Sequence, residues 1–190
     1  DFRDENGVDI GTGQPNEMEI SAGYARKLSD AFSASLSAKF AYSNLATGRT
    51  LGAYTITTAK TFAADIGFFY RNKLGASGRR NYLNAGLALT NLGAKVTYTK
   101  GVVKDFIPSN LAIGAAYEMN FDDYNSLTAV IEINKLLIPS PRKPGDADYD
   151  VDSNKIADYR EKGLFEGVFG SLSDAPGGFT EETQELMFSL

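Results

Sequence analysis

Hydrophobic and polar residues alternate along most of this chain with a period of two. In Phe32–Tyr42 every second residue is apolar, and the residues between them are mostly serine and lysine. Successive side chains of a β-strand point to opposite faces, whereas a helix would spread both sets around its circumference. The segment is therefore predicted to be a strand with one apolar face.

The same alternation recurs in five further segments and predicts a strand in each of them: Glu17–Tyr24, Phe62–Arg71, Leu83–Thr90, Leu111–Phe121 and Leu127–Asn134. A length of about ten residues suits a strand that crosses a membrane at a tilt. Phe69 and Val130 are apolar residues on the otherwise polar faces. The pattern predicts an all-β protein.

The connections between these segments are short on one side and long on the other. The short ones are predicted to be turns: Leu28–Ala31, Asp122–Asn125 and Asn72–Arg80. The long ones are predicted to be loops: Asn44–Thr58, Asn91–Pro108 and Pro139–Thr183. This arrangement is typical of an antiparallel transmembrane β-barrel of the outer membrane.

Aromatic residues gather at both ends of the predicted strands, as the two girdles of a membrane barrel would. The alternative is a soluble β-sandwich, which would need shorter strands and gives no reason for girdles. Six strands and the start of a seventh cannot close a membrane barrel of at least about eight strands. The acidic start, Asp1–Asp9, has no apolar signal-peptide core. We therefore expect residues 1–190 to be an internal part of a single barrel domain.

The composition argues against two classes of function, enzymes and nucleic-acid-binding proteins. The chain has no His and no Cys, so the commonest general base and the thiol nucleophile are missing. We predict a binding or conduit protein and no enzyme. The net charge of −5 and the lack of a basic cluster argue against nucleic acid as a partner.

An acidic stretch in the last long loop has the ligand spacing of a calcium loop. Its candidate ligands stand at positions one, three, five, nine and twelve: Asp150, Asp152, Asn154, Asp158 and Glu161. Ca²⁺ takes six to eight oxygen ligands, and such loops supply them at this spacing. Lys155 stands at position six, where glycine usually makes the sharp turn. Two interpretations stay open, a Ca²⁺ site and a solvated acidic loop.

A second candidate site follows in the same loop, where Pro and Gly-Gly suit a tight turn. It comprises Asp174, Ala175, Pro176, Gly177, Gly178 and Phe179. The Lys and Ser/Thr of a phosphate-binding loop do not follow it. We predict a shaped loop that binds a partner.

Five strings in order resemble one protein family: YARKLSDAFSASLSAKFAYSNL, KTFAADIGFFYRN, NLGAKVTYT, EINKLLIPSP and GSLSDAPGGFTEE. Together they resemble the PorV family of the type IX secretion system of Bacteroidetes, which is related in architecture to the FadL-type fatty-acid transporters. The resemblance covers nearly the whole chain. SDAPGGF after NKLLIPSP is its most specific part, and the insert DADYDVDSNKIADYREKG departs from it.

The resemblance implies a roughly 14-stranded FadL-like barrel in the bacterial outer membrane, surrounded by membrane lipids, with long extracellular loops. It implies binding of cargo proteins through their C-terminal secretion signal. It also implies association with a Sov/SprA-type translocon barrel and transfer of cargo to the surface attachment complex. We expect Leu137–Thr183 to be the outward loop that makes these contacts.

Two other functions stay open. One is a FadL-like uptake channel for hydrophobic small molecules, for which Phe69 and Val130 on the polar face are the indication. The other is a structural or adhesive surface barrel, which the calcium-like loop would support.

Overall fold

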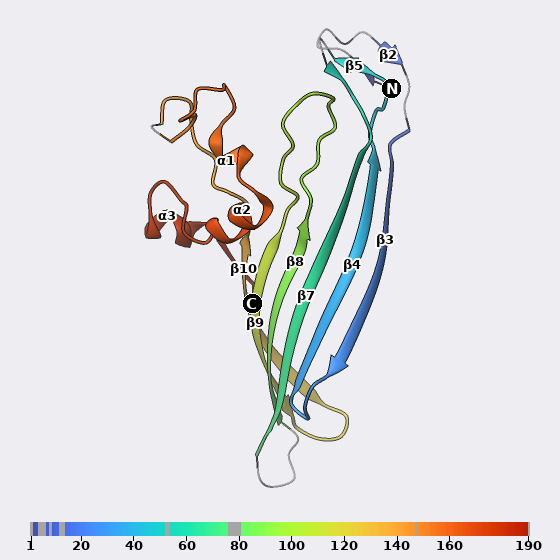
Figure 1. The fold of residues 1–190 in the computed structure, drawn as a ribbon. Helices are drawn as coiled ribbons and strands as arrows, with labels where there is room; N and C mark the ends of the chain where they lie inside the picture. The colour runs from blue at the N-terminus through green and yellow to red at the C-terminus, as the bar shows by residue number, and fades with distance from the viewer. Residues whose placement is uncertain are drawn as a thin grey trace.

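The computed structural model describes residues 2–3, 7, 9–11, 14–51, 54–75, 81–146 and 148–189. Its main element is a seven-stranded antiparallel sheet with the order β11-β10-β9-β8-β7-β4-β3 (Figure 1). Six of its strands have 11 to 16 residues: β3 (Asn16–Lys27), β4 (Phe32–Asn44), β7 (Ala59–Leu74), β8 (Asn81–Gly93), β9 (Asn110–Asn120) and β10 (Ser126–Leu136). The seventh, β11 (Leu186–Ser189), has four.

The remaining elements are small. Two two-stranded sheets pair β1 (Phe2–Arg3) with β2 (Asp9–Gly11), and β5 (Thr50–Leu51) with β6 (Tyr54–Thr55). Three short helices lie between β10 and β11: α1 (Asp158–Glu161), α2 (Leu164–Gly170) and α3 (Phe179–Gln184). None of the helices in the described ranges is long and apolar enough to cross a membrane.

All six strands predicted from the alternation are present, and the prediction of an all-β antiparallel protein is confirmed. The turns predicted at Leu28–Ala31 and Asp122–Asn125 join β3 to β4 and β9 to β10. The predicted turn Asn72–Arg80 and loop Asn44–Thr58 lie partly outside the described residues.

Two predicted boundaries are wrong: β7 continues to Leu74 although a turn was expected from Asn72, and β8 continues to Gly93 although a loop was expected from Asn91. A β-bulge explains the difference at β8. The register of β7 and β8 shifts between Ala64 and Ile66, and Asn91 on β8 adopts a left-handed conformation with φ 59°. The extra residue lets the strand keep its pairing beyond the point where the alternation breaks.

The register places the predicted apolar residues in continuous rows across the sheet. One row runs through Tyr24, Leu36, Ile66, Leu89, Leu111, Lys135 and Leu186, and its neighbour through Ala34, Phe68, Leu87, Ile113, Ile133 and Phe188. We call this side the outer face. Its large side chains are exposed, for example Leu36 at 57% and Phe62 at 71%.

The outer face is not covered by a second sheet among the described residues. Few hydrophobic side chains are buried among the described residues, and the largest of them, Leu137 and Val168, lie in the helical segment and not on the outer face. A soluble sandwich would bury one whole face of this sheet. An apolar surface of this extent marks a contact with a membrane or a partner.

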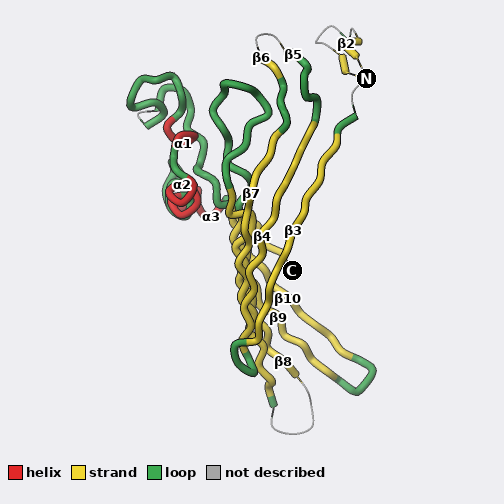
Figure 2. The backbone as a smooth tube through the Cα atoms, turned by 45° about the vertical axis from the view of Figure 1, so that its right-hand side comes forward, coloured by secondary structure: helices red, strands yellow, loops and turns green. Residues whose placement is uncertain are grey.

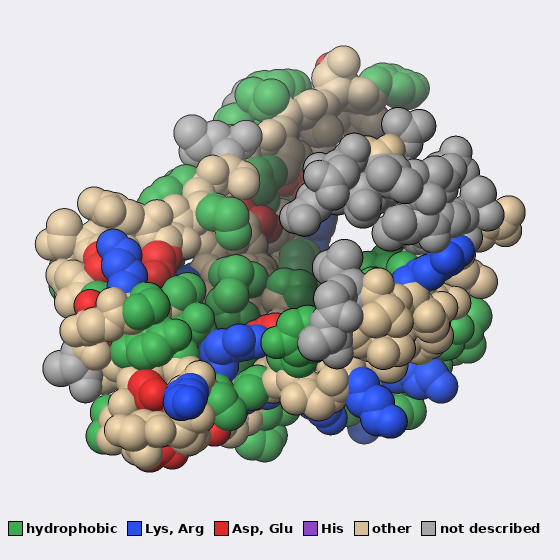
Figure 3. All heavy atoms as spheres, turned by 90° about the horizontal axis from the view of Figure 1, so that it is seen from above, with side chains coloured by type: hydrophobic (Ala, Val, Ile, Leu, Met, Phe, Trp, Pro, Cys, Tyr) green, Lys and Arg blue, Asp and Glu red, His purple; other side chains and the backbone are tan. Residues whose placement is uncertain are grey.

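The sheet is curved but open, since β3 and β11 each pair with one neighbour. Figures 1 and 2 show α1–α3 beside the upper ends of β8, β9 and β10, on the convex side of the curve. Seen from above, the molecule is hollowed near its centre, and acidic and basic side chains are visible beside the hollow (Figure 3). The predicted loop Pro139–Thr183 is thus a partly helical segment that lies at the long-loop end of the sheet.

Candidate functional site

The concave face carries the polar residues of the alternation, and they pair between strands. Lys39 on β4 forms a salt bridge of 2.8 Å with Asp65 on β7, which also accepts a hydrogen bond from Ser37. The bulge adds Asn91, whose side-chain oxygen accepts from Lys39 at 2.7 Å and whose backbone amide donates to Asp65 at 2.8 Å. The bulge therefore completes a three-strand network.

A second ion pair lies nearer the tight turns. Arg71 on β7 reaches Glu118 on β9 at 2.9 Å across β8, and its guanidinium lies 3.9 Å from the ring centroid of Tyr82. Between the two networks the concave face is lined by small residues such as Gly67, Gly86 and Gly114. They leave a hollow of about 460 Å³, which Phe69 and Val130 also line.

The helical segment of residues 137–185 is tied to the end of β10 by an ion triad whose lysine is buried. Lys135 donates to Glu182 on α3 and to the neighbouring Glu185, with both distances at 2.6 Å. The Lys135 side chain is 7% exposed and that of Glu182 is 11% exposed. A charged residue in an apolar row requires such partners, because an unpaired buried charge is costly.

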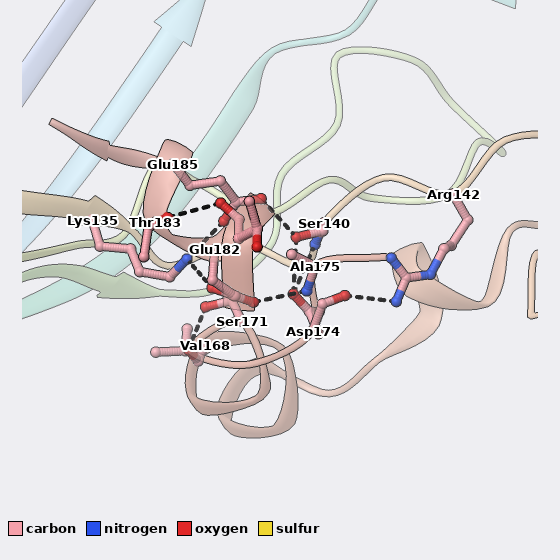
Figure 4. A network of polar contacts seen from close by, with 11 residues as sticks. Lys135, Ser140, Arg142, Val168, Ser171, Asp174, Ala175, Glu182, Thr183 and Glu185 are labelled. Carbon is pink, nitrogen blue, oxygen red and sulfur yellow. Dashed lines mark hydrogen bonds and ion pairs between the residues drawn. The ribbon is translucent and has the colours of Figure 1, made fainter. Parts of the chain in front are cut away.

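Asp174 is the centre of a second cluster beside this triad (Figure 4). Its carboxylate accepts hydrogen bonds from the Ser140 hydroxyl at 3.0 Å and from Lys162 at 3.2 Å. Its backbone carbonyl accepts from Arg142 at 2.7 Å. The Ser140 hydroxyl lies equally close to Glu185, at 3.0 Å, so it joins the two clusters. Together they fix the start and the end of the segment to each other.

Glu182 also holds the turn before α3. Its carboxylate accepts a hydrogen bond of 2.7 Å from the backbone amide of Ala175. Burial alone would raise the pKa of Glu182, but the hydrogen bonds from Lys135 and Ala175 outweigh it and hold this pKa below its usual value. Glu182 is therefore a carboxylate at neutral pH.

A further set of contacts docks α1 and α2 on the hairpin of residues 94–108. Arg160 forms a salt bridge of 2.7 Å with Asp105, and Lys95 donates to the backbone carbonyls of Arg160 and Lys162. Burial lowers the pKa of Lys95. Gly167 lies against the Phe106 ring so closely that a Cβ at this position would overlap it. Side-chain size at 167 therefore controls how α2 docks.

The structure brings three of the five predicted calcium ligands together. Carboxylate oxygens of Asp150, Asp152 and Asp158 lie within 4.8 Å of one another. The Asn154 amide donates to Asp152 and to Glu161, each at 3.0 Å, which places the last predicted ligand at the same loop. These oxygens suit a hard divalent cation such as Ca²⁺.

The backbone of this loop makes the turn that the sequence left in doubt. Lys155, at the position where glycine is usual, adopts φ 69°. The backbone amides of Asn154 and Lys155 both donate to the Asp150 carboxylate, at 3.0 and 2.9 Å. The hydrogen bonds to Asp150 accompany a left-handed conformation that is uncommon for a lysine.

The predicted partner-binding turn is divided between anchored and exposed residues. Asp174 and Ala175 face the clusters described above, and Ala175 is buried. Gly178 has φ 67° and ψ −151°, a combination essentially restricted to glycine. Phe179, the next residue, is 84% exposed. The contacts of Asp174 and Ala175 therefore anchor the backbone of the turn, and the Phe179 side chain is exposed on it.

The sequence did not indicate the residues that hold the segment in place: Lys135, Ser140, Arg142, Glu182 and Glu185. One signal was available for Lys135, since it continues the apolar alternation of Ile131 and Ile133 and breaks it with a charge. The partners of Lys135 lie about fifty residues later in the chain, and no local pattern connects them.

Comparison with known protein families identifies the family of this chain. The model of a family described as type IX secretion system protein PorV matches residues 1–143. Among curated proteins none matches the chain. The matched region includes the six long strands and ends shortly after β10, so most of the helical segment lies beyond it.

Proposed function

The chain belongs to the PorV family of type IX secretion system proteins, and we propose that it forms part of a β-barrel in the bacterial outer membrane. A member of this family is a component of a protein secretion system, and the family is not one of known enzymes. The finer proposal concerns how this chain is placed in the membrane and what it binds.

The exposed outer face supports the membrane placement. Aromatic residues stand near both ends of this face, with Phe32 stacked on Phe68 near the tight turns and Phe40 packed against Phe62 near the long loops. Aromatic girdles of this kind lie at the two boundaries of a bilayer. We infer that lipid covers the outer face and that further strands of the longer protein close the wall between β3 and β11.

The single observation that carries the binding proposal is the anchored segment of residues 137–185 at the long-loop end of the sheet. Its two polar clusters hold the turn of residues 174–179 on β10 and leave Phe179 exposed. Aromatic side chains such as this one are enriched in protein interfaces, and the anchored backbone keeps the position of Phe179 defined. We infer that this segment contacts cargo proteins through their C-terminal secretion signal, the Sov/SprA-type translocon barrel, and the surface attachment complex.

The hollow on the concave face favours a second candidate function. At about 460 Å³, with Phe69 and Val130 beside small residues, it has room for part of a hydrophobic small molecule. This would make the protein a FadL-like uptake channel. The ion pairs above and below the hollow, Lys39–Asp65 and Arg71–Glu118, would flank such a molecule.

We also propose that the acidic loop binds Ca²⁺. The gathered carboxylates of Asp150, Asp152 and Asp158 repel one another, and a divalent cation would offset this. Because α1 begins at Asp158 and its Arg160 contacts Asp105, the cation would stabilise the docking of the segment on the hairpin of residues 94–108.

Affinity purification of the full-length protein from its own outer membrane in mild detergent, followed by mass spectrometry, tests the secretion proposal. We expect to recover a very large translocon barrel together with proteins that share a C-terminal signal domain. Recovery of the barrel alone with bound fatty acids would contradict it and favour the uptake channel. The matched control is the same purification with a variant in which residues 174–179 are shortened.

A further inference from the structure

The two faces of α2 have opposite surroundings. Val168 is 1% exposed, and Gly167 lies against Phe106 and Pro139. On the other face Phe165 and Phe169 are 69% and 53% exposed, and their rings stack on each other with centroids 6.5 Å apart. The helix therefore turns an aromatic pair away from the protein.

The position of this aromatic pair follows from the register of the sheet. Lys135 stands in an outer row with Leu89 and Leu111, and it reaches the carboxylates of Glu182 and Glu185. The helical segment therefore packs on the outer side of β10 and not over the concave face. Figures 1 and 2 agree, since the helices lie on the convex side beside the upper strand ends.

The outer surface beside the segment is apolar as well. Ile133 and Phe188, which pair across β10 and β11, are 36% and 64% exposed. The one acidic residue of α2, Glu166, turns its carboxylate back toward the backbone amide of Gly163 at 3.4 Å. The aromatic pair of α2 and the outer side of β10 and β11 are thus both apolar and exposed.

We propose that Phe165 and Phe169 insert into the lipid leaflet around the upper strand ends, so that α2 is a membrane-interface anchor for the helical segment. The inference rests on the proposed placement of the outer face in lipid. An amphipathic helix of this kind buries its aromatic residues at the boundary between headgroups and acyl chains. Insertion would hold the segment at a fixed height above the bilayer core.

Tryptophan fluorescence in lipid vesicles tests this contact directly. The full-length protein carries one substitution at a time, Phe165→Trp or Phe169→Trp, and is reconstituted in phosphatidylcholine with or without bromine on the acyl chains. Residues 1–190 contain no Trp, and the emission of the unsubstituted protein is subtracted. Val151→Trp, at a position that is 70% exposed on the acidic loop, is the water-facing control. Leu36→Trp on the outer face is the lipid-facing control.

We expect brominated lipid to reduce the emission at 165 and 169 about twofold or more, as at Leu36, and to leave Val151→Trp unchanged. If Leu36→Trp is quenched while both helix positions behave like Val151→Trp, the anchor is wrong and the membrane placement of the strands stands. If Leu36→Trp is not quenched either, the proposed function fails together with the anchor. The emission of Phe165→Trp could instead become shielded from water only after a purified translocon is added. That result would show a protein contact at this position and would overturn the lipid contact.

Discussion

The Lys135 Nζ lies 2.6 Å from the Glu182 Oε2, although 47 positions separate the two residues in the sequence. This contact joins the last long strand to the final short helix, and it is buried on both sides. Breaking one partner of a buried ion pair leaves an uncompensated charge. The contact is therefore the main electrostatic link between the sheet and the helical segment.

The first prediction follows from this link. Lys135→Met keeps the length of the side chain but leaves Glu182 and Glu185 without their cation, so we expect the docking of residues 137–185 to weaken by about 3 kcal/mol. Limited proteolysis in detergent should then cut this segment first while the strands stay protected. The control is Lys27→Met, which removes an exposed ion pair with Asp30 and should change little. Equal resistance of both variants would contradict the prediction.

The depressed pKa of Glu182 predicts a pH dependence of the same docking. A carboxyl whose pKa is lower when folded stabilises the structure fully above its usual value of 4.5, and this contribution is lost as the pH falls through the folded pKa. Hydrogen exchange of residues 174–185 should therefore quicken on acidification below 4.5, beyond the intrinsic effect of pH on exchange. In Glu182→Gln this additional dependence should be much smaller. An unchanged pH profile in that variant would show that another group is responsible.

Substitutions of Asn91 test the proposed role of the β-bulge. Its φ of 59° is strained for a β-branched residue, and its side chain holds Lys39. We expect Asn91→Val to lose the side-chain contact and to add about 1–2 kcal/mol of backbone strain. Asn91→Gly loses the same contact without the strain. The urea midpoint of unfolding, followed by heat-modifiable mobility on gels, should be lower for the valine variant than for the glycine variant. Equal midpoints would argue against a left-handed Asn91.

Calcium binding by the acidic loop gives another prediction. Replacing Asp150 and Asp152 by Asn removes two charges from the cluster while keeping one oxygen on each side chain. We expect the half-saturating Ca²⁺ concentration, measured by calorimetry on the full-length protein, to rise about tenfold or more. Asp123→Asn in the exposed turn between β9 and β10 changes the charge elsewhere and should have no effect. Absence of any Ca²⁺-dependent heat in the unsubstituted protein would rule the site out.

The strands were predictable because each needs only its own alternation. The segment Phe32–Tyr42 predicted β4 nearly to its end, and the strand extends only two residues further. The bulge at Asn91 was not predictable, because its left-handed conformation depends on Asp65 and Lys39 from two other strands.

The helical segment, unlike the strands, was not predictable from its local pattern. α2 has seven residues, too few for a helical period to stand out, although the spacing of Phe165 and Phe169 fits one turn of a helix. The sequence predicted that the acidic ligands and the turn of residues 174–179 belong to one outward region. It did not predict Lys135 as the residue that holds this region, since the partners of that lysine are distant in sequence.

Site-specific photo-crosslinking at Phe179 in living cells tests the secretion role of the exposed segment most directly. The photoreactive residue replaces Phe179, and the same residue at Val151 on the acidic loop is the control, since both side chains are exposed. We expect adducts at 179 with the translocon barrel or with proteins that carry a C-terminal secretion signal, and a weaker yield or other adducts at 151. A position 179 that gives only lipid adducts, or no adduct while cargo is being secreted, would contradict a role of this turn in binding secretion partners.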